Sequence, residues 1–221
     1  MTPPVQRSVA NQAWYAFLKF ASQLGAIGFF NIRCGGRDKV PPSGGGLMLS
    51  NHQSNLDPVL VGLASKRRLN YVARKTLFTF PPFRWLINSL DAISIDREGT
   101  GLEGLKETLR RLKRGEIVLL FPEGTRTPDG DVRAMKPGFC AVARRSGVPI
   151  LPVAVDGAWE AWPRQLKYPR RAVIHVQFGD PIGVAEINRL TDEQLVTEVE
   201  LRIRACHARA HEGRLRASGK L

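Results

Sequence analysis

Cysteine is scarce in this chain, with Cys34, Cys140 and Cys206 the only three among 221 residues. They lie far apart, no CxxC pair occurs, and no cysteine–histidine spacing matches a zinc site. The sequence therefore gives no indication of a disulfide framework or a metal centre, and it indicates reduced thiols in a cytosolic setting. A chain of this length fits one domain, which buries enough surface to fold without such crosslinks.

Acidic residues are also few. The chain has 20 Asp and Glu against 33 Lys and Arg, which gives a formal net charge of +13. A surplus of this size indicates a polyanionic partner such as nucleic acid, an anionic membrane surface or a phosphorylated substrate. A solvated basic surface that aids solubility is the alternative. No known nucleic-acid-binding motif is present, so we expect no nucleic acid partner.

Long uncharged apolar runs are missing as well. Residues 13–32 have the length of a membrane-spanning helix but contain Lys19, Ser22 and Gln23. Apolar residues recur at helical spacing on one side of this segment, and they are Trp14, Phe17, Leu18, Ala21 and Leu24. We expect a helix that lies in the bilayer interface, with a core helix docked on the domain as the alternative. The start of the chain does not resemble a signal peptide.

Glycine and proline divide the chain early. Gly35-Gly36 and the run PPSGGG at residues 41–46 break the helical pattern. We therefore expect residues 1–40 to form an N-terminal amphipathic membrane-interface segment and residues 41–221 to form the main domain.

Short apolar runs alternate with helical patterns along the main domain. The expected strands are Gly46–Ser50, Asn70–Ala73, Ala92–Asp96, Ile117–Phe121, Ile150–Val155 and Ala172–Phe178. The expected helices are Pro58–Lys66, Phe83–Leu90, Leu102–Lys113, Gly138–Ser146 and Asp192–Ala210. This alternation predicts an α/β fold with a mixed, largely parallel central sheet flanked by helices. Ligands of such sheets gather where strands end and helices begin.

The stretch NHQSNLD, residues 51–57, places polar residues between two apolar runs. His52 comes just after an expected strand, and Asp57 comes just before Pro58 and an expected helix. Considered alone, His52 is interpreted as a loop histidine and Asp57 as the N-cap of the helix. A turn between them would let Asp57 reach one ring nitrogen of His52 and leave the other nitrogen as a base, as in a catalytic dyad. No serine or cysteine nucleophile accompanies the pair, so we expect a base that activates a substrate hydroxyl.

Three later stretches add to this loop. They are SIDRE, which contains Arg97, FPEGTRT at residues 121–127, and MKPGF at 135–139 followed by VPILPVAV at 148–155. With the H-x4-D loop, they resemble in order all four blocks of the glycerophospholipid acyltransferase superfamily, and in particular its bacterial lysophosphatidic acid acyltransferases. The resemblance implies the fold of the glycerol-3-phosphate acyltransferases and the transfer of an acyl chain from a thioester to a glycerol hydroxyl.

The resemblance also implies roles for individual residues. His52 resembles the general base and Asp57 its orienting partner. Arg97, Arg126 and Lys136 resemble cations near the acceptor phosphate, which suits the pairing of guanidinium groups with phosphate oxygens. The block that shapes the acceptor pocket contains Glu123, Gly124 and Thr125. The residues on the acyl-donor side are Val148, Pro149, Ile150 and Pro152.

The resemblance further implies the partners. We expect a lysophospholipid acceptor, an acyl-coenzyme A or acyl carrier protein thioester as co-substrate, no tightly bound cofactor and no metal. We expect peripheral attachment to the cytoplasmic face of the cell membrane. Family members often have glycine where this chain has Arg84 and Asp91, so acylation of a different lysolipid is also compatible with the sequence. A non-catalytic protein that binds anionic lipid and a hydrolase are two rival interpretations, although the chain has no G-x-S-x-G elbow.

Overall fold

The computed structural model describes residues 8–10, 13–14, 16–17, 29–74, 93–95 and 102–219. The expected helix Phe83–Leu90, most of the expected helix over residues 13–32, and Arg84, Asp91 and Arg97 lie outside these residues. Among the described residues, no helix is both long enough and apolar enough to span a bilayer.

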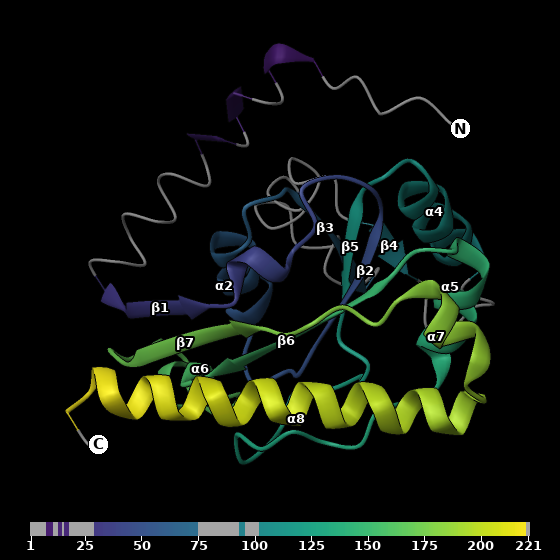
Figure 1. The fold of residues 1–221 in the computed structure, drawn as a ribbon. Coiled ribbons are helices and arrows are strands. Elements are labelled where there is room, and N and C mark those ends of the chain that lie inside the picture. The colour runs from purple at the N-terminus through teal and green to yellow at the C-terminus, as the bar shows by residue number, and fades with distance from the viewer. Residues whose placement is uncertain are drawn as a thin grey trace.

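A sheet of seven strands forms the centre of the domain, in the order β1-β7-β6-β2-β5-β3-β4 (Figure 1). The strands are β1 (Asn31–Gly35), β2 (Gly46–Ser50), β3 (Leu69–Arg74), β4 (Ile93–Ile95), β5 (Ile117–Leu120), β6 (Ile150–Asp156) and β7 (Val173–Phe178). All neighbours pair in parallel except β6 and β7, which are antiparallel. The predicted α/β fold with a mixed, largely parallel sheet is confirmed.

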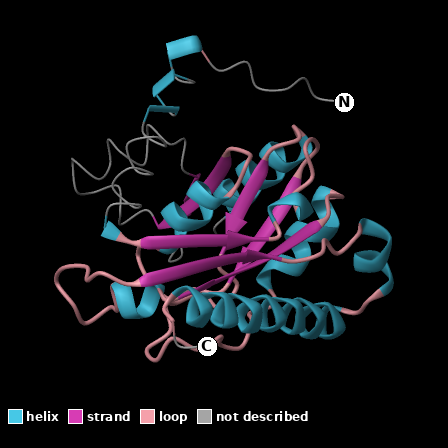
Figure 2. Cartoon of the chain, turned by 60° about the vertical axis from the view of Figure 1, so that its left-hand side comes forward, coloured by secondary structure: helices cyan, strands magenta, loops and turns pink. Residues whose placement is uncertain are grey.

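Helices cover both faces of this sheet (Figure 2). They are α2 (Asp57–Ala64), α4 (Leu102–Lys113), α5 (Gly138–Ser146), α6 (Ala158–Ala161), α7 (Val184–Arg189) and α8 (Asp192–Ala217), with the 3-10 helix η1 (Arg37–Lys39) after β1. A capping box at Thr191 and Gln194 starts α8, because each side chain satisfies a backbone N–H of the other.

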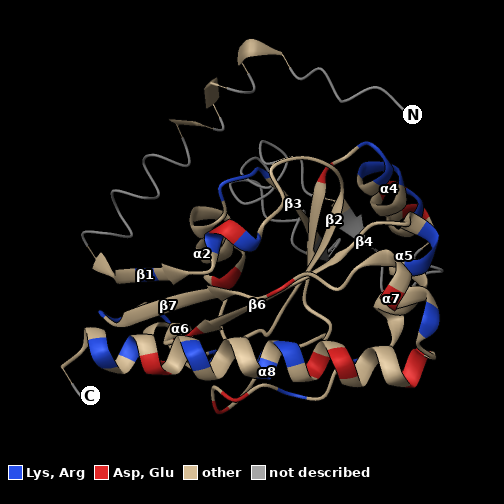
Figure 3. Cartoon of the chain, in the orientation of Figure 1, with Lys and Arg blue, Asp and Glu red and all other residues tan. Residues whose placement is uncertain are grey.

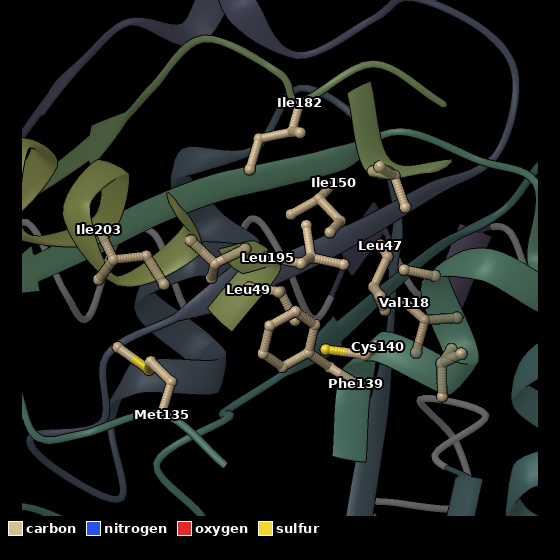
Figure 4. Close-up of a cluster of buried hydrophobic side chains, with 14 of the residues drawn as sticks. Leu47, Leu49, Val118, Met135, Phe139, Cys140, Ile150, Ile182, Leu195 and Ile203 are labelled. Atoms are coloured by element: carbon tan, nitrogen blue, oxygen red, sulfur yellow. The ribbon is translucent and has the colours of Figure 1, made fainter. Parts of the chain in front are cut away.

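Alternation along β2 builds two hydrophobic cores. Leu47 and Leu49 point to the face covered by α5 and α8, where they pack with residues such as Phe139 and Leu195 (Figure 4). Met48 points to the other face and packs with α2. Successive strand residues face opposite sides, so a strand buried between two helical layers carries apolar side chains toward both faces. All five residues of β2 are buried, and Leu47, Met48 and Leu49 are apolar.

The parallel register brings several strand ends together. β2, β5 and β6 end at one edge of the sheet, and β7 and β1 begin at that same edge because β7 runs antiparallel to β6. We call this the carboxyl edge. The loop after β2, the loop after β5 and the segment after β6 therefore meet there.

Four features differ from the sequence-based map. β1, α6 and α7 were not expected, and α8 continues to Ala217 rather than ending at Ala210. Asn31 and Ile32 pair with β7 as part of β1, so the helix expected over residues 13–32 is wrong at its end. The sheet also begins at Asn31, ahead of the expected boundary at residue 41.

Candidate active site

The loop of residues 51–56 joins β2 to α2 at the carboxyl edge, and its polar side chains anchor it. Asn51 is fully buried, and its amide group exchanges two hydrogen bonds with the backbone of Val155, at 2.9 Å and 2.8 Å. The Ser54 hydroxyl donates to the carbonyl oxygen of Trp162 at 2.8 Å. These bonds fix the loop against β6 and the segment that follows it. They explain why polar residues stand between two apolar runs.

Gln53 is the most connected side chain of this loop. Its Oε1 accepts from the backbone N–H groups of Ala158 and Trp159, at 3.1 Å and 3.2 Å. Its Nε2 donates to the carbonyl oxygen of Gly130 at 2.6 Å and lies 3.3 Å from Nε2 of His207. Gln53 thus joins the loop to α6, to the loop after β5 and to α8. It was not predicted as a site residue, because a glutamine between a histidine and a serine has no distinctive spacing.

His52 and Asp57 meet as expected. Nδ1 of His52 lies 2.8 Å from Oδ2 of Asp57, and the carboxylate is fully buried. The same oxygen accepts from the backbone N–H groups of Gln53 and Ser54, at 2.6 Å and 2.8 Å. The N-cap of α2 is Leu56, and no side chain caps that helix. The Asp57 carboxylate therefore binds the preceding loop and His52 rather than capping the helix.

Further contacts hold both the ring and the backbone of His52. The ring stacks on Phe121, with ring centroids 4.1 Å apart and planes 22° from parallel. The carbonyl oxygen of His52 accepts from Thr127 N–H at 2.7 Å. Its side chain keeps 20% exposure, and Nε2 has no hydrogen-bond partner among the described residues. With Nδ1–H donated to Asp57, Nε2 can accept a proton from a ligand.

Glu123 lies behind His52 rather than at the surface. It is 3% exposed, and its Oε1 accepts from the backbone N–H of His52 at 3.2 Å. Burial raises the pKa of this carboxyl from 4.5 to about 8, the backbone N–H groups of His52 and Arg133 lower it, and the charge of Asp57 raises it further. Oε2 is buried and has no partner within the described part of the chain. A neutral carboxylic acid at pH 7 fits this environment.

The loop after β5 brings more of the predicted residues to the same place. Gly124 has φ 74°, a left-handed conformation that favours glycine, and a Cβ there would lie 3.2 Å from the side chain of Lys136. The backbone N–H of Lys136 donates to the carbonyl of Pro122 at 2.9 Å. Thr125 and Lys136 are exposed, and Arg126 is half-buried. Two cations thus come from the loop that also supplies Glu123.

The four residues expected on the acyl-donor side lie elsewhere. Val148, Pro149 and Ile150 stand at the amino end of β6, level with Gly46 and Leu47, which is the edge of the sheet opposite His52. Val148, Ile150 and Pro152 are buried. Val148 and Ile150 belong to the same hydrophobic core as Leu47 and Leu49, and Ile150 is labelled in Figure 4. Pro152 lies further along β6, level with Leu49, so three of the four residues stand at the edge opposite His52 and the fourth lies within the buried strand.

Phe121 is a second residue of the site that the sequence did not reveal. As the first letter of FPEGTRT, it read as the end of a strand. Its contact with His52 follows from the pairing of β2 with β5, in which Leu49 lies beside Leu120. No group of three or more His, Cys, Asp or Glu side chains within the described ranges could hold a metal ion.

Comparisons with known proteins identify relatives of this chain. The chain is 30% identical over 190 residues to the 1-acyl-sn-glycerol-3-phosphate acyltransferase of Pseudomonas aeruginosa, across 80% of this chain and 72% of that protein. It is 30% identical to the enzyme of the same name from Streptococcus pneumoniae, across 72% of this chain and 59% of that protein.

The fold also has a solved counterpart. A crystal structure of the 1-acyl-sn-glycerophosphate (LPA) acyltransferase from Thermotoga maritima superimposes with a TM-score of 0.76 at 24% identity, covering 91% of this chain and 83% of the other. The family model described as Acyltransferase matches residues 31–156, from the first residue of β1 to the last residue of β6. The chain therefore belongs to the acyltransferase family.

Proposed function

We propose that this protein transfers an acyl chain from an acyl thioester to the free glycerol hydroxyl of lysophosphatidic acid, which gives phosphatidic acid for phospholipid biosynthesis. One observation supports this most strongly: Nδ1 of His52 is bound to the buried Asp57 carboxylate at 2.8 Å while the ring stays partly exposed. The names of the relatives from Pseudomonas aeruginosa and Streptococcus pneumoniae support the choice of acceptor.

The dyad would act as a general base. Nε2 of His52 removes the proton from the acceptor hydroxyl as its oxygen attacks the thioester carbonyl carbon. Asp57 stabilises the imidazolium that forms, because its buried carboxylate faces Nδ1. The C–O ester bond forms as the C–S bond breaks, and the imidazolium returns the proton to the leaving thiolate. General-base catalysis of this kind contributes ~10²–10⁴-fold to a rate.

The acceptor phosphate would lie among the cations of the loop after β5. We assign Arg126 and Lys136 to this phosphate, with Arg97 as a third cation on sequence grounds. A phosphate monoester carries up to two negative charges, and charge-assisted hydrogen bonds to such oxygens are about twice as strong as neutral ones. Glu123 is neutral at pH 7 in this proposal, so it would not repel the phosphate.

The membrane and the donor complete the proposal. The donor is acyl-coenzyme A or acyl carrier protein, and the N-terminal segment ahead of β1 lies in the bilayer interface at the cytoplasmic face. The experiment that tests the function incubates the protein with the acyl thioester and a panel of lysolipid acceptors, and follows free thiol and acylated product. Product with lysophosphatidic acid above all other acceptors is expected. Preference for another lysolipid would assign a different acceptor. Thiol release without acylated lipid would indicate a hydrolase. If neither free thiol nor acylated lipid formed, the remaining interpretation would be a lipid-binding protein.

A further inference from the structure

The segment between α6 and β7, residues 162–172, is strongly basic and is called the basic loop below. It contains no Asp or Glu, and its cations are Arg164, Lys167, Arg170 and Arg171. All of these side chains are exposed, and within the described part of the chain none forms an ion pair. Tyr168 stands among them at 70% exposure, with Nζ of Lys167 5.5 Å from the centre of its ring.

Several basic residues of α8 are arranged differently. Along α8, acidic and basic residues are interspersed (Figure 3). Arg202 pairs with Glu198 and Glu186, and Arg204 pairs with Glu200. Charges paired in this way produce little field at a distance. The basic loop therefore concentrates part of the net charge of +13 on one uncompensated surface.

Hydrogen bonds hold the backbone of the basic loop at both ends. The indole N–H of Trp162 donates to the carbonyl of Leu166 at 3.0 Å, and the N–H of Arg170 donates to the carbonyl of Ala161 at 2.7 Å. The loop ends where Asn31 N–H donates to the carbonyl of Ala172 at 3.2 Å. Its cations are thus carried on a hydrogen-bonded backbone, and binding to them costs less backbone ordering entropy than binding to a chain segment without such bonds.

The position of the basic loop relates it to both the active site and the N-terminal segment. It follows β6 at the carboxyl edge, and its first residue, Trp162, accepts the hydrogen bond from Ser54 of the His52 loop at 2.8 Å. It also lies beside the start of β1, because Asn31 pairs with Val173 and Phe29, just before β1, is 40% exposed. Figure 2 shows the loop projecting at the end of the sheet where β1 and β7 begin.

We propose that the basic loop is a membrane-contact surface that binds anionic phospholipid headgroups and holds the carboxyl edge against the bilayer. Exposed arginine and lysine attract the negatively charged leaflet, and an exposed tyrosine suits the headgroup level of the interface. The loop would act together with the N-terminal segment, which enters the domain beside it. This proposal rests on the proposed function in one respect: the carboxyl edge faces the bilayer because the acceptor and the product both reside there.

An acidic acyl carrier protein could also bind a basic surface, but two features favour the bilayer. The aromatic ring of Tyr168 is presented together with the cations, and the loop lies where the N-terminal segment joins the sheet.

The test uses the full chain with Arg164, Lys167, Arg170 and Arg171 all changed to Gln. Each basic residue near an anionic surface contributes roughly fivefold in partitioning, so we expect at least about 100-fold weaker binding to phosphatidylcholine–phosphatidylglycerol vesicles at physiological salt. Binding to pure phosphatidylcholine should change little. Turnover of a short-chain, water-soluble lysophosphatidate should stay near that of the unchanged protein, because none of these residues belongs to the active site.

A matched control changes the same amount of charge at the opposite edge of the sheet. Lys66, Lys113, Arg145 and Arg189 are exposed and lie near the ends of α2, α4, α5 and α7. Their replacement by Gln should weaken vesicle binding only a few-fold. Equal losses in the two variants, or no loss in the basic-loop variant, would overturn the proposal. Unchanged vesicle binding with a raised KM for acyl carrier protein would assign the loop to the donor instead.

The two proposals fail separately. Loss of vesicle binding in the basic-loop variant stands even if the unchanged protein acylates no lysophosphatidate, which would contradict only the proposed function. Normal acylation with unchanged vesicle binding would contradict only the membrane surface.

Discussion

Oδ2 of Asp57 lies 2.8 Å from Nδ1 of His52 and accepts two backbone hydrogen bonds from the residues between them. The carboxylate therefore holds both the imidazole and the loop that bears it. We expect Asp57→Asn to lower kcat by about 10²-fold or more, because an amide can accept the same bonds but cannot stabilise the imidazolium. Thermal unfolding should change little by comparison. Unchanged kcat with a lower Tm would show that Asp57 only orders the loop.

Gln53 gives a separate prediction about positioning. Gln53→Leu leaves the N–H groups of Ala158 and Trp159 without their acceptor and the carbonyl of Gly130 without its donor. Each buried group left unsatisfied costs ~1–3 kcal/mol, so we expect the free energy of unfolding to fall by about 2–4 kcal/mol. We also expect kcat to fall while KM for the acyl donor stays the same. Gln53→Glu keeps the acceptor and should recover part of both losses. Normal stability in Gln53→Leu, measured by urea denaturation, would contradict this role.

Glu123 should make stability depend on pH. Its pKa rises from 4.5 in the unfolded chain to about 8 in the folded protein, mainly through burial. Between these values the folded state keeps a proton that the unfolded state has released, so the free energy of unfolding falls as pH rises. Glu123→Gln removes this titration. Its free energy of unfolding should therefore rise relative to that of the unchanged protein as the pH increases from 4.5 to about 8. A stability difference that stays constant over this range, followed by urea denaturation at each pH, would show that the carboxyl does not titrate there.

Arg126 tests the assignment of the acceptor phosphate. A charged hydrogen bond contributes ~1.5–3 kcal/mol, or roughly tenfold to over a hundredfold in affinity. We therefore expect Arg126→Ala to raise KM for lysophosphatidic acid by at least about tenfold and to leave KM for the thioester nearly unchanged. Arg133→Ala is the matched control, because Arg133 is exposed, lies on the same loop and pairs with Asp129 at 2.8 Å. A change confined to the thioester would place Arg126 on the donor side.

The sequence predicted the sheet and the dyad because both depend on local patterns. Leu47, Met48 and Leu49 form an apolar run of strand length, and the five-residue spacing of His52 and Asp57 needs only a turn. β1 was missed because its sequence, NIRCG, has no apolar alternation and is held by pairing with β7, far along the chain. The end of α8 was missed for a similar reason. Arg214 there binds the buried Asp156, and Gly213 packs so closely that a Cβ would lie 2.4 Å from the ring of His175.

The contacts of Gln53 and Phe121 could not be predicted for the same physical reason. Each depends on which strands lie side by side, and a single sequence does not contain that order. The pairing of β2 with both β5 and β6 places Phe121 against His52 and α6 against Gln53.

The most direct test of the account is the turnover of His52→Ala with lysophosphatidic acid and an acyl thioester. His52 is partly exposed and Phe121 covers one face of its ring, so the variant should fold with a near-normal circular dichroism spectrum. The expected result is a loss of at least ~10²-fold in kcat. The control is His211→Ala, because His211 lies on α8 outside the site, and this variant should keep most of the turnover. A folded His52→Ala protein that retained more than about a tenth of normal turnover would contradict the assignment of His52 as the general base.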